Sequence, residues 1–323
     1  MAERILITGT SGFIGSALGR ALRERQGLEV FGVSRRPPLA GATDDHLAHD
    51  LATPLPSSVP RADVIVHCAA RASPWGSEED YHRDNVVTLR HMLEFAERTK
   101  PRRFVFISSS SVHYNFADQE GLREDTPWPT RPVSRYAASK RVGEAMVRGL
   151  EGVPWTILRP RAVFGPGDTV LFPRILEAAR RGALPEIARR GASARTNLLF
   201  IDNLCRYVEA VVARDAGGVF LLTDREVIDV ARELRGVFER LDIPPPRRRI
   251  GPGTALAAAG AMELAYRVLG RRDEPPATRF GVANLAYTRT FDITRAIEEL
   301  GPPPVTTAEG IDAFVTWQKA QPA

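Results

Sequence analysis

Three glycines between an apolar run and a helix-like segment constrain the fold of this chain most. Residues 4–7 have the continuous apolar character of a buried parallel strand, and residues 16–25 have a helical pattern. Between them, Gly9 permits a tight turn, Gly12 lets the backbone approach a pyrophosphate, and Gly15 lets the helix pack closely on the strand. The order of strand, glycine turn and helix predicts a dinucleotide site at the helix N-terminus, with G-x-x-G-x-x-G spacing rather than G-x-G-x-x-G.

Strands and helices alternate through residue 160, which predicts an α/β chain with a doubly wound parallel sheet, a Rossmann fold. The rhythm then breaks, and a smaller, mostly C-terminal lobe is expected to bind the substrate. The cofactor domain is expected at 1–160 plus about 197–225, and the lobe at 161–196 plus about 226–323. Strands are predicted at 4–7, 29–34, 47–51, 62–70, 103–108, 156–158, 197–201 and 219–222. Helices are predicted at 16–25, 78–98, 136–150, 172–181, 228–241 and 254–269.

The end of the second strand indicates which dinucleotide is bound. An acidic residue there would favour NAD, but this chain has Ser34, Arg35 and Arg36. Two guanidinium groups suit a 2′-phosphate, so NADP(H) is favoured over NAD(H), although a solvated surface pair is the alternative. Asp50 is a candidate partner of the adenine amino group. Further candidate cofactor contacts are Phe13, Ile14, Leu51, Ala69, Ala70 and Pro160.

Tyr136 and Lys140 are four residues apart in a predicted helix and therefore lie on one face. The chain has 44 basic residues, but only Lys100, Lys140 and Lys319 are lysines. An ammonium beside a phenol favours the phenolate and is expected to lower its pKa. Tyr136 is therefore a candidate acid/base residue. Taken alone, the pattern also fits a surface lysine beside a half-buried tyrosine.

Four motifs together resemble the extended short-chain dehydrogenase/reductase family. They are T-G-x-x-G-F-I-G at 8–15, the serine run at 108–111, Y-x-x-x-K at 136–140 and R-P-x-x-V-F-G-P at 159–166. The resemblance implies that Tyr136 is the general acid, that Lys140 holds the nicotinamide ribose, and that Ser109, or otherwise Ser110, polarises a carbonyl. It also implies that the backbone near Val163 meets the carboxamide. Shorter motifs at 72–76, 165–168, 200–203 and 291–296 resemble the 3β-hydroxysteroid dehydrogenase branch, which includes reductases of β-keto acids.

The resemblance implies an NADP(H)-dependent oxidoreductase that interconverts a ketone and a secondary alcohol on a hydrophobic, β-keto acyl or steroid-like substrate. A sugar-nucleotide epimerase is the alternative, although Arg195 is one residue out of register with the arginine that grips the diphosphate in such enzymes. A dehydratase would need an Asp-Glu pair where Ser110 and Ser111 stand. A non-catalytic NADP-sensing protein would be expected to lose Tyr136 or Lys140.

Composition narrows the remaining possibilities. The net charge of +5 is scattered, without a long basic stripe, so a nucleic-acid partner is not expected. Cys68 and Cys205 are too few for a disulfide framework or a metal site, and His67 is expected in the core. No signal peptide or membrane span is expected, which favours a cytoplasmic protein. The apolar helix at 254–269 is interpreted as core packing or a wall of the substrate site. A homodimer through the helices at 78–98 and 136–150 is the expectation from the family.

Overall fold

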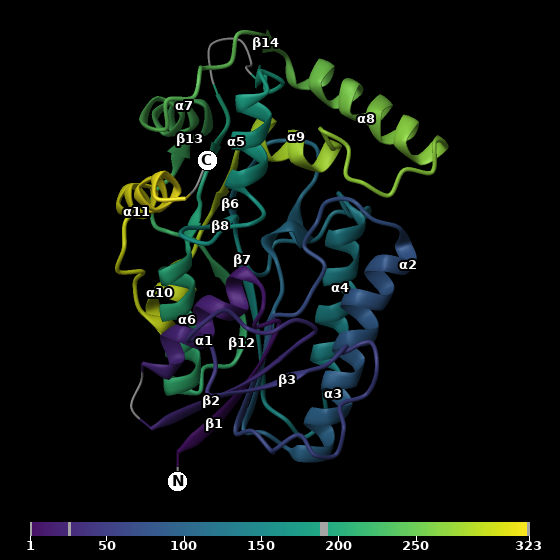
Figure 1. Cartoon of the computed structure of the whole chain (residues 1–323), viewed down its shortest axis with the longest axis vertical. Coiled ribbons are helices and arrows are strands. Elements are labelled where there is room, and N and C mark those ends of the chain that lie inside the picture. The colour runs from purple at the N-terminus through teal and green to yellow at the C-terminus, as the bar shows by residue number, and fades with distance from the viewer. Residues whose placement is uncertain (1, 25–26, 188–192, 322–323) are drawn as a thin grey trace.

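The computed structural model describes residues 2–24, 27–187 and 193–321. Its centre is a seven-stranded sheet in which every neighbouring pair is parallel (Figure 1). The order across the sheet is β12 (Gly218–Leu222), β7 (Trp155–Pro160), β5 (Arg103–Ile107), β4 (Val64–His67), β1 (Glu3–Thr8), β2 (Leu28–Ser34) and β3 (Asp45–Ala48). The strand order reverses direction between β1 and β4, and this is the arrangement of a doubly wound sheet. The predicted fold class is confirmed.

Helices cover both faces of this sheet, which explains why its strands are apolar without alternation. On β1, Ile5 and Ile7 pack into one core cluster and Leu6 into the other. One face carries α1 (Phe13–Arg23), α6 (Ile201–Arg214) and α10 (Thr294–Leu300) (Figure 1). The other carries α3 (Thr88–Thr99) and α4 (Arg135–Arg148).

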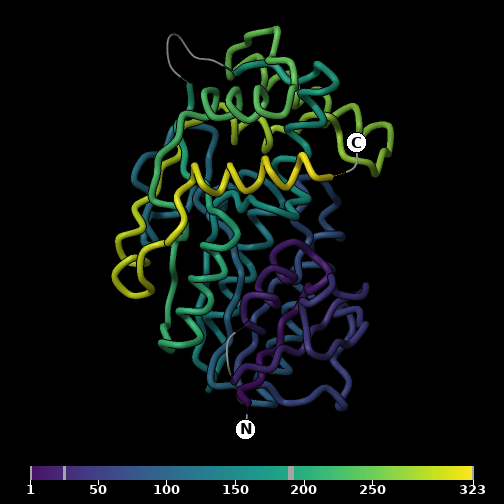
Figure 2. The backbone as a smooth tube through the Cα atoms, turned by 60° about the vertical axis from the view of Figure 1, so that its left-hand side comes forward, coloured from purple at the N-terminus to yellow at the C-terminus, as the bar shows by residue number. Residues whose placement is uncertain are grey.

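A smaller lobe lies beyond the carboxyl ends of the parallel strands (Figure 1). Its four-stranded sheet has the order β13 (Ile228–Asp229), β10 (Arg195–Thr196), β15 (Arg289–Phe291) and β6 (Gln119–Leu122). Two short pairs join β8 (Val163–Phe164) to β11 (Leu199–Phe200) and β9 (Glu186–Ile187) to β14 (Arg249–Ile250). Its helices are α5 (Phe172–Arg180), α7 (Val230–Arg240), α8 (Pro252–Val268), α9 (Arg279–Ala286) and α11 (Thr307–Lys319). Figure 2 shows α11 crossing the molecule near its middle.

Some predicted elements differ from those observed. The helix predicted at 78–98 is interrupted: α2 (Glu78–Tyr81) leads into a π-helical turn, η1 (His82–Val87), before α3 begins. The strand predicted at 47–51 is instead Asp45–Ala48, so Asp50 and Leu51 lie in the turn after it. Residues 163–164, where no strand is predicted, form the short strand β8. Backbone pairing with segments distant in sequence fixes these last two boundaries, and local pattern does not show such pairing.

The apolar helix predicted at 254–269 forms, as α8, but it is not simple core packing. Its buried side, with Ala255 and Ala259, packs against α9. Its outer side exposes Leu264 and Val268, at 62% and 76% of their surface, and Leu269 follows at 72%. Within the described residues, no helix is both long and apolar enough to cross a bilayer.

Candidate active site

The glycine turn has the geometry that close backbone approach requires. Gly9 has φ +76°, and a Cβ there would lie 3.0 Å from the backbone nitrogen of Ala69. A Cβ on Gly15 would lie 2.3 Å from the carbonyl oxygen of Gly9. The N-cap of α1 is Gly12, and no side chain caps the helix, so the first N–H groups of α1 are open to a ligand. These features fit a dinucleotide pyrophosphate.

A cavity of about 540 Å³ runs from this turn into the smaller lobe. Every residue predicted to contact cofactor or to act in catalysis lies on its wall. These residues are Gly9, Gly12, Phe13, Ile14, Gly15, Arg35, Arg36, Asp50, Leu51, Ala69, Ala70, Ser109, Tyr136, Lys140, Pro160 and Val163. The structure therefore brings together residues from seven parts of the sequence. No residue of α8 lines the cavity, so the interpretation of this helix as a substrate wall is wrong.

Tyr136 and Lys140 lie on α4, where the helix passes the carboxyl end of β5. The hydroxyl of Ser134 caps this helix by accepting the N–H of Ala137 at 3.1 Å, which fixes where the helix begins. Lys140 is buried, and its Nζ donates to the carbonyl oxygen of Ile107 at 2.7 Å. Burial lowers the pKa of Lys140 to about 8. The ammonium is therefore tied to the sheet edge, and it loses its proton more readily than the ammonium of an exposed lysine.

The effect on Tyr136 differs from the sequence prediction. Burial raises the pKa of Tyr136 to about 12, and a hydrogen bond from Ser109 opposes the shift. The Nζ of Lys140 lies 6.0 Å from the centre of the Tyr136 ring and is engaged by Ile107. The prediction that Lys140 lowers the pKa of Tyr136 is wrong for the protein alone, because desolvation of the phenolate dominates.

The two candidate serines have different partners. Ser109 begins a short 3₁₀ turn, η2 (Ser110–His113), where its Oγ accepts the N–H of Ser111 at 3.2 Å. The same side chain hydrogen-bonds Tyr136. Ser110 is 1% exposed, and its Oγ lies 2.6 Å from the hydroxyl of Tyr114. Ser109 is therefore the serine beside the candidate acid, and Ser110 is engaged elsewhere.

Glu144, which the sequence analysis missed, extends the same stripe of α4. Its carboxylate accepts two hydrogen bonds from Arg159 on β7, at 2.8 and 2.7 Å, and one from Ser108 at 2.7 Å. It is fully buried and favours the ammonium of Lys140 electrostatically. The pair with Arg159 fixes α4 to the sheet. Spacing was the available signal, since Glu144 follows Lys140 by four residues.

Arg35 and Arg36 are exposed at the opposite end of the cavity. Ser34, which precedes them, is buried, and its hydroxyl donates to the carbonyl oxygen of Arg36 at 2.8 Å. This bond shapes the turn at the end of β2. The two guanidinium groups therefore stand on an ordered backbone and face solvent.

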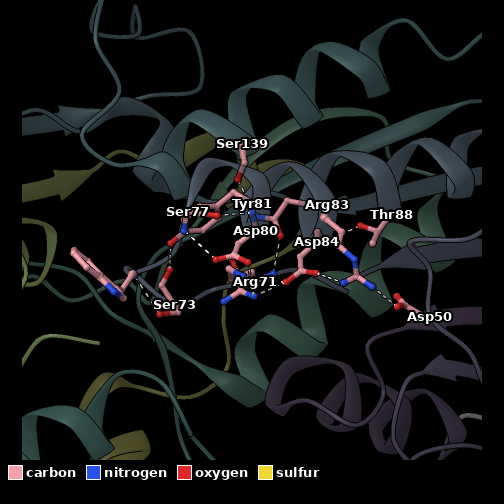
Figure 3. A network of polar contacts seen from close by, with 12 residues as sticks. Asp50, Arg71, Ser73, Ser77, Asp80, Tyr81, Arg83, Asp84, Thr88 and Ser139 are labelled. Carbon is pink, nitrogen blue, oxygen red and sulfur yellow. Dashed lines mark hydrogen bonds and ion pairs between the residues drawn. The ribbon is translucent and has the colours of Figure 1, made fainter. Parts of the chain in front are cut away.

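An ion-pair chain that the sequence analysis missed includes three residues of the cavity wall, Asp50, Arg71 and Asp84 (Figure 3). Asp50 pairs with Arg83, Arg83 with Asp84 at 2.9 Å, and Asp84 with Arg71 at 2.9 Å. Arg83 and Asp84 lie in the π-helical turn. Asp50 therefore lines the cavity with its carboxylate already engaged by Arg83.

Two residues considered in the sequence lie away from the cavity wall. His67 is 1% exposed, its Nδ1 is 3.0 Å from the hydroxyl of Thr8, and burial lowers its pKa to about 3. The prediction of a core histidine is confirmed. Arg195 lies outside the cavity and pairs with Glu120 at 3.1 Å.

Residues 5–222 match the model of the NAD dependent epimerase/dehydratase family. The chain belongs to this family. It is an extended short-chain dehydrogenase/reductase, and the recognition from motifs is confirmed. Together with relatives that are named as reductases, this match makes the chain an NAD(P)-dependent oxidoreductase, as predicted.

Three comparisons describe its relatives. A 2-alkyl-3-oxoalkanoate reductase of Stenotrophomonas maltophilia is 31% identical, over 95% of this chain and 97% of the relative. A 3 beta-hydroxysteroid dehydrogenase/Delta 5→4-isomerase of Mycobacterium tuberculosis is 28% identical, over 95% and 87%. These relatives support the predicted branch. The solved UDP-glucuronic acid 4-epimerase of Bacillus cereus, in complex with NAD, is similar in fold, with a TM-score of 0.72, 20% identity and 98% of both chains covered.

Proposed function

We propose that this protein reduces a ketone on a hydrophobic substrate to a secondary alcohol, with NADPH as the reductant. The observation that carries the proposal is the meeting of Ser109, Tyr136 and Lys140 on the wall of one cavity. The relatives named as 3-oxoalkanoate reductase and hydroxysteroid dehydrogenase act on this chemical class, which supports it.

The chain's own residues would divide the work between them. The hydroxyl of Ser109 would donate a hydrogen bond to the carbonyl oxygen, which makes the carbonyl carbon more electrophilic. Bound NADPH supplies the hydride for that carbon. The O–H bond of Tyr136 would break as its proton passes to the carbonyl oxygen, and such proton transfer contributes about 10²–10⁴-fold in rate. Burial raises the pKa of Tyr136 to about 12, so at neutral pH the phenol carries the proton that it would donate.

The cofactor preference rests on Arg35 and Arg36. No carboxylate stands at the end of β2 to accept hydrogen bonds from ribose hydroxyls, whereas two guanidinium groups line the cavity there. Arginine binds phosphate through charge-assisted, bidentate hydrogen bonds. We therefore infer that NADP(H) is preferred over NAD(H).

The alternative function, a sugar-nucleotide epimerase, has less support. The solved UDP-glucuronic acid 4-epimerase shares the fold at 20% identity, and such a likeness does not indicate which substrate this chain binds. The arginine nearest the diphosphate-gripping position, Arg195, is paired with Glu120 outside the cavity. Apolar side chains instead line the lobe end of the cavity: Leu171, Phe172, Ile175, Leu198, Ile228, Leu234, Phe280 and Leu285.

The test is a panel of carbonyl substrates assayed with NADPH and with NADH. It includes 3-oxo acids, 3-oxoacyl thioesters and 3-ketosteroids, and UDP-sugars are assayed alongside with NAD⁺. We expect NADPH consumption and formation of the alcohol with at least one ketone. Isomerisation of a UDP-sugar without reduction of any ketone would overturn the proposal.

A further inference from the structure

A buried positive charge lies at the lobe end of the cavity. Arg161, directly after β7, is 5% exposed and lines the cavity wall. Every Asp and Glu of the chain lies among the described residues, and none of them forms an ion pair with Arg161. Burying a charge without an opposite charge is costly, so such an arginine needs an explanation.

The partners of Arg161 are neutral. Its Nε and Nη2 donate to the hydroxyl oxygen of Thr196 at 3.3 and 3.1 Å, and its Nη1 donates to Oδ1 of Asn284 at 3.2 Å. Thr196 and Asn284 also line the cavity. These contacts orient the guanidinium but leave its charge uncompensated, and two of its five N–H groups remain for a ligand.

A second buried arginine strengthens the positive field. Arg289, on β15, is fully buried, and its guanidinium carbon lies 4.4 Å from the centre of the Tyr114 ring. The guanidinium carbon of Arg161 lies 5.3 Å from the centre of the same ring. Burial lowers the pKa of Arg289 to about 10, and Arg161 acts in the same direction. An anion beside Arg161 would relieve repulsion between these two cations.

Tyr114 connects this charge to the catalytic end. Its hydroxyl lies 2.6 Å from Oγ of Ser110, the residue after Ser109, and Tyr114 also influences the pKa of Tyr136. Arg161 is therefore one aromatic ring away from the serine run. In a 3-oxo acid the carboxylate carbon is two bonds from the ketone carbon, so the two groups of one substrate would occupy neighbouring parts of the cavity that Tyr136 and Arg161 both line.

We propose that Arg161, oriented by Thr196 and Asn284, binds the carboxylate of a free 3-oxo acid substrate. This inference rests on the proposed ketone reduction and deepens it. A bidentate pair between a carboxylate and the guanidinium selects the free acid over uncharged forms of the same ketone. Esters and thioesters of the acid lack the negative charge, and a 3-ketosteroid substrate has no carboxylate.

The test compares a freshly prepared 2-alkyl-3-oxo acid with its methyl ester. Wild-type protein should reduce the acid with a kcat/KM about 10–100-fold above that of the ester, the size of a hydrogen-bonded charge contact. Arg161→Gln should lose the preference for the acid because the KM for the acid rises. The kcat/KM for the ester should change little. Arg161→Lys should keep part of the ratio, because it keeps charge without the planar fork.

Arg195→Gln is the matched control. It also replaces an arginine next to Thr196 in sequence, but Arg195 is exposed and paired with Glu120, so the acid-to-ester ratio should not change. Thermal unfolding of each variant identifies loss of fold. Binding of a non-reducible 2-alkylalkanoate to the protein with NADP⁺, measured by calorimetry, supplies a readout independent of turnover and should weaken in Arg161→Gln.

The outcomes separate the two proposals. Equal reduction of acid and ester by wild-type protein overturns the carboxylate site and leaves ketone reduction standing. Equal loss of both substrates in Arg161→Gln assigns the residue a structural role and also overturns it. If the protein reduces no ketone, the proposed function fails, and unweakened alkanoate binding in Arg161→Gln then removes the site as well.

Discussion

Two pairs of arginines stand at or behind the wall near the two ends of the cavity, and the two pairs are held in different ways. Arg35 and Arg36 are exposed on the turn after β2. Arg161 and Arg289 are buried around Tyr114 in the smaller lobe. An exposed guanidinium costs little to keep and binds its ligand in competition with water and salt. A buried one is oriented before the ligand arrives, and its interactions are less screened.

This difference separates cofactor choice from substrate choice. The exposed pair can be removed without disturbing packing, so its loss should change affinity for one cofactor. The buried pair contributes to the lobe itself, since Arg289 donates to the carbonyl oxygens of Ala283 and Asn115 at 2.7 and 2.8 Å. Changes at that end should affect substrate preference and stability together. Tyr136 stands between the ends and serves both.

The largest effect is expected from a substitution that abolishes the reaction and leaves the arginines near both ends of the cavity unchanged. Tyr136→Phe deletes the hydroxyl that gives up a proton, and turnover should fall by at least about 10²–10⁴-fold. Steady-state rates measure this loss, and NADPH binding by fluorescence should remain near the wild-type value. Substantial residual turnover would remove Tyr136 from the role of general acid.

A smaller effect distinguishes the exposed pair. Replacing Arg35 and Arg36 by alanine should raise the KM for NADPH by about 10–100-fold, because charge-assisted hydrogen bonds to phosphate are lost. The KM for NADH should hardly change, and neither should the preference for acid over ester. Equal losses with both cofactors would refute the phosphate role.

The smallest effect is a pH dependence centred on Lys140. Because burial lowers its pKa to about 8, the ammonium is present below that pH and is lost above it. If the ammonium holds the nicotinamide ribose, NADPH affinity should be constant at lower pH and fall by up to about tenfold per unit above pH 8.

Lys140→Arg provides the control for this pH dependence, since a guanidinium stays charged throughout the range. Titrations from pH 6.5 to about 9.5 should show the step in wild-type protein and no step in the variant. A wild-type affinity that stays level across pH 8 contradicts the role given to Lys140.

The sequence predicted those parts of the fold and of the site whose residues lie close together along the chain. The glycine turn lies in the short connection between β1 and α1, and Tyr136 and Lys140 lie on the single helix α4. Each signal is therefore visible in a short stretch of sequence, and the structure brings both to one cavity. Arg161 and Arg289 are far apart in the sequence. They lie close together because β15 pairs with β10 and β6, and local sequence patterns do not predict this pairing.

The direction of the Tyr136 pKa could not be predicted for a related reason. The sequence places an ammonium one helical turn away, but it does not show how much water the phenol loses on folding. The ion pair of Glu144 with Arg159 was equally hidden, because it joins a helix to a neighbouring strand. Distances along one helix can be deduced from spacing, whereas burial depends on the whole fold.

The most direct test of the account follows the products of one preparation of the protein under two conditions. One mixture contains NADPH and a 2-alkyl-3-oxo acid, and the other contains NAD⁺ and a UDP-sugar. Mass spectrometry and chromatography identify the products. We expect the 3-hydroxy acid in the first mixture and unchanged sugar in the second. An epimerised sugar in the second, with no alcohol in the first, would contradict it.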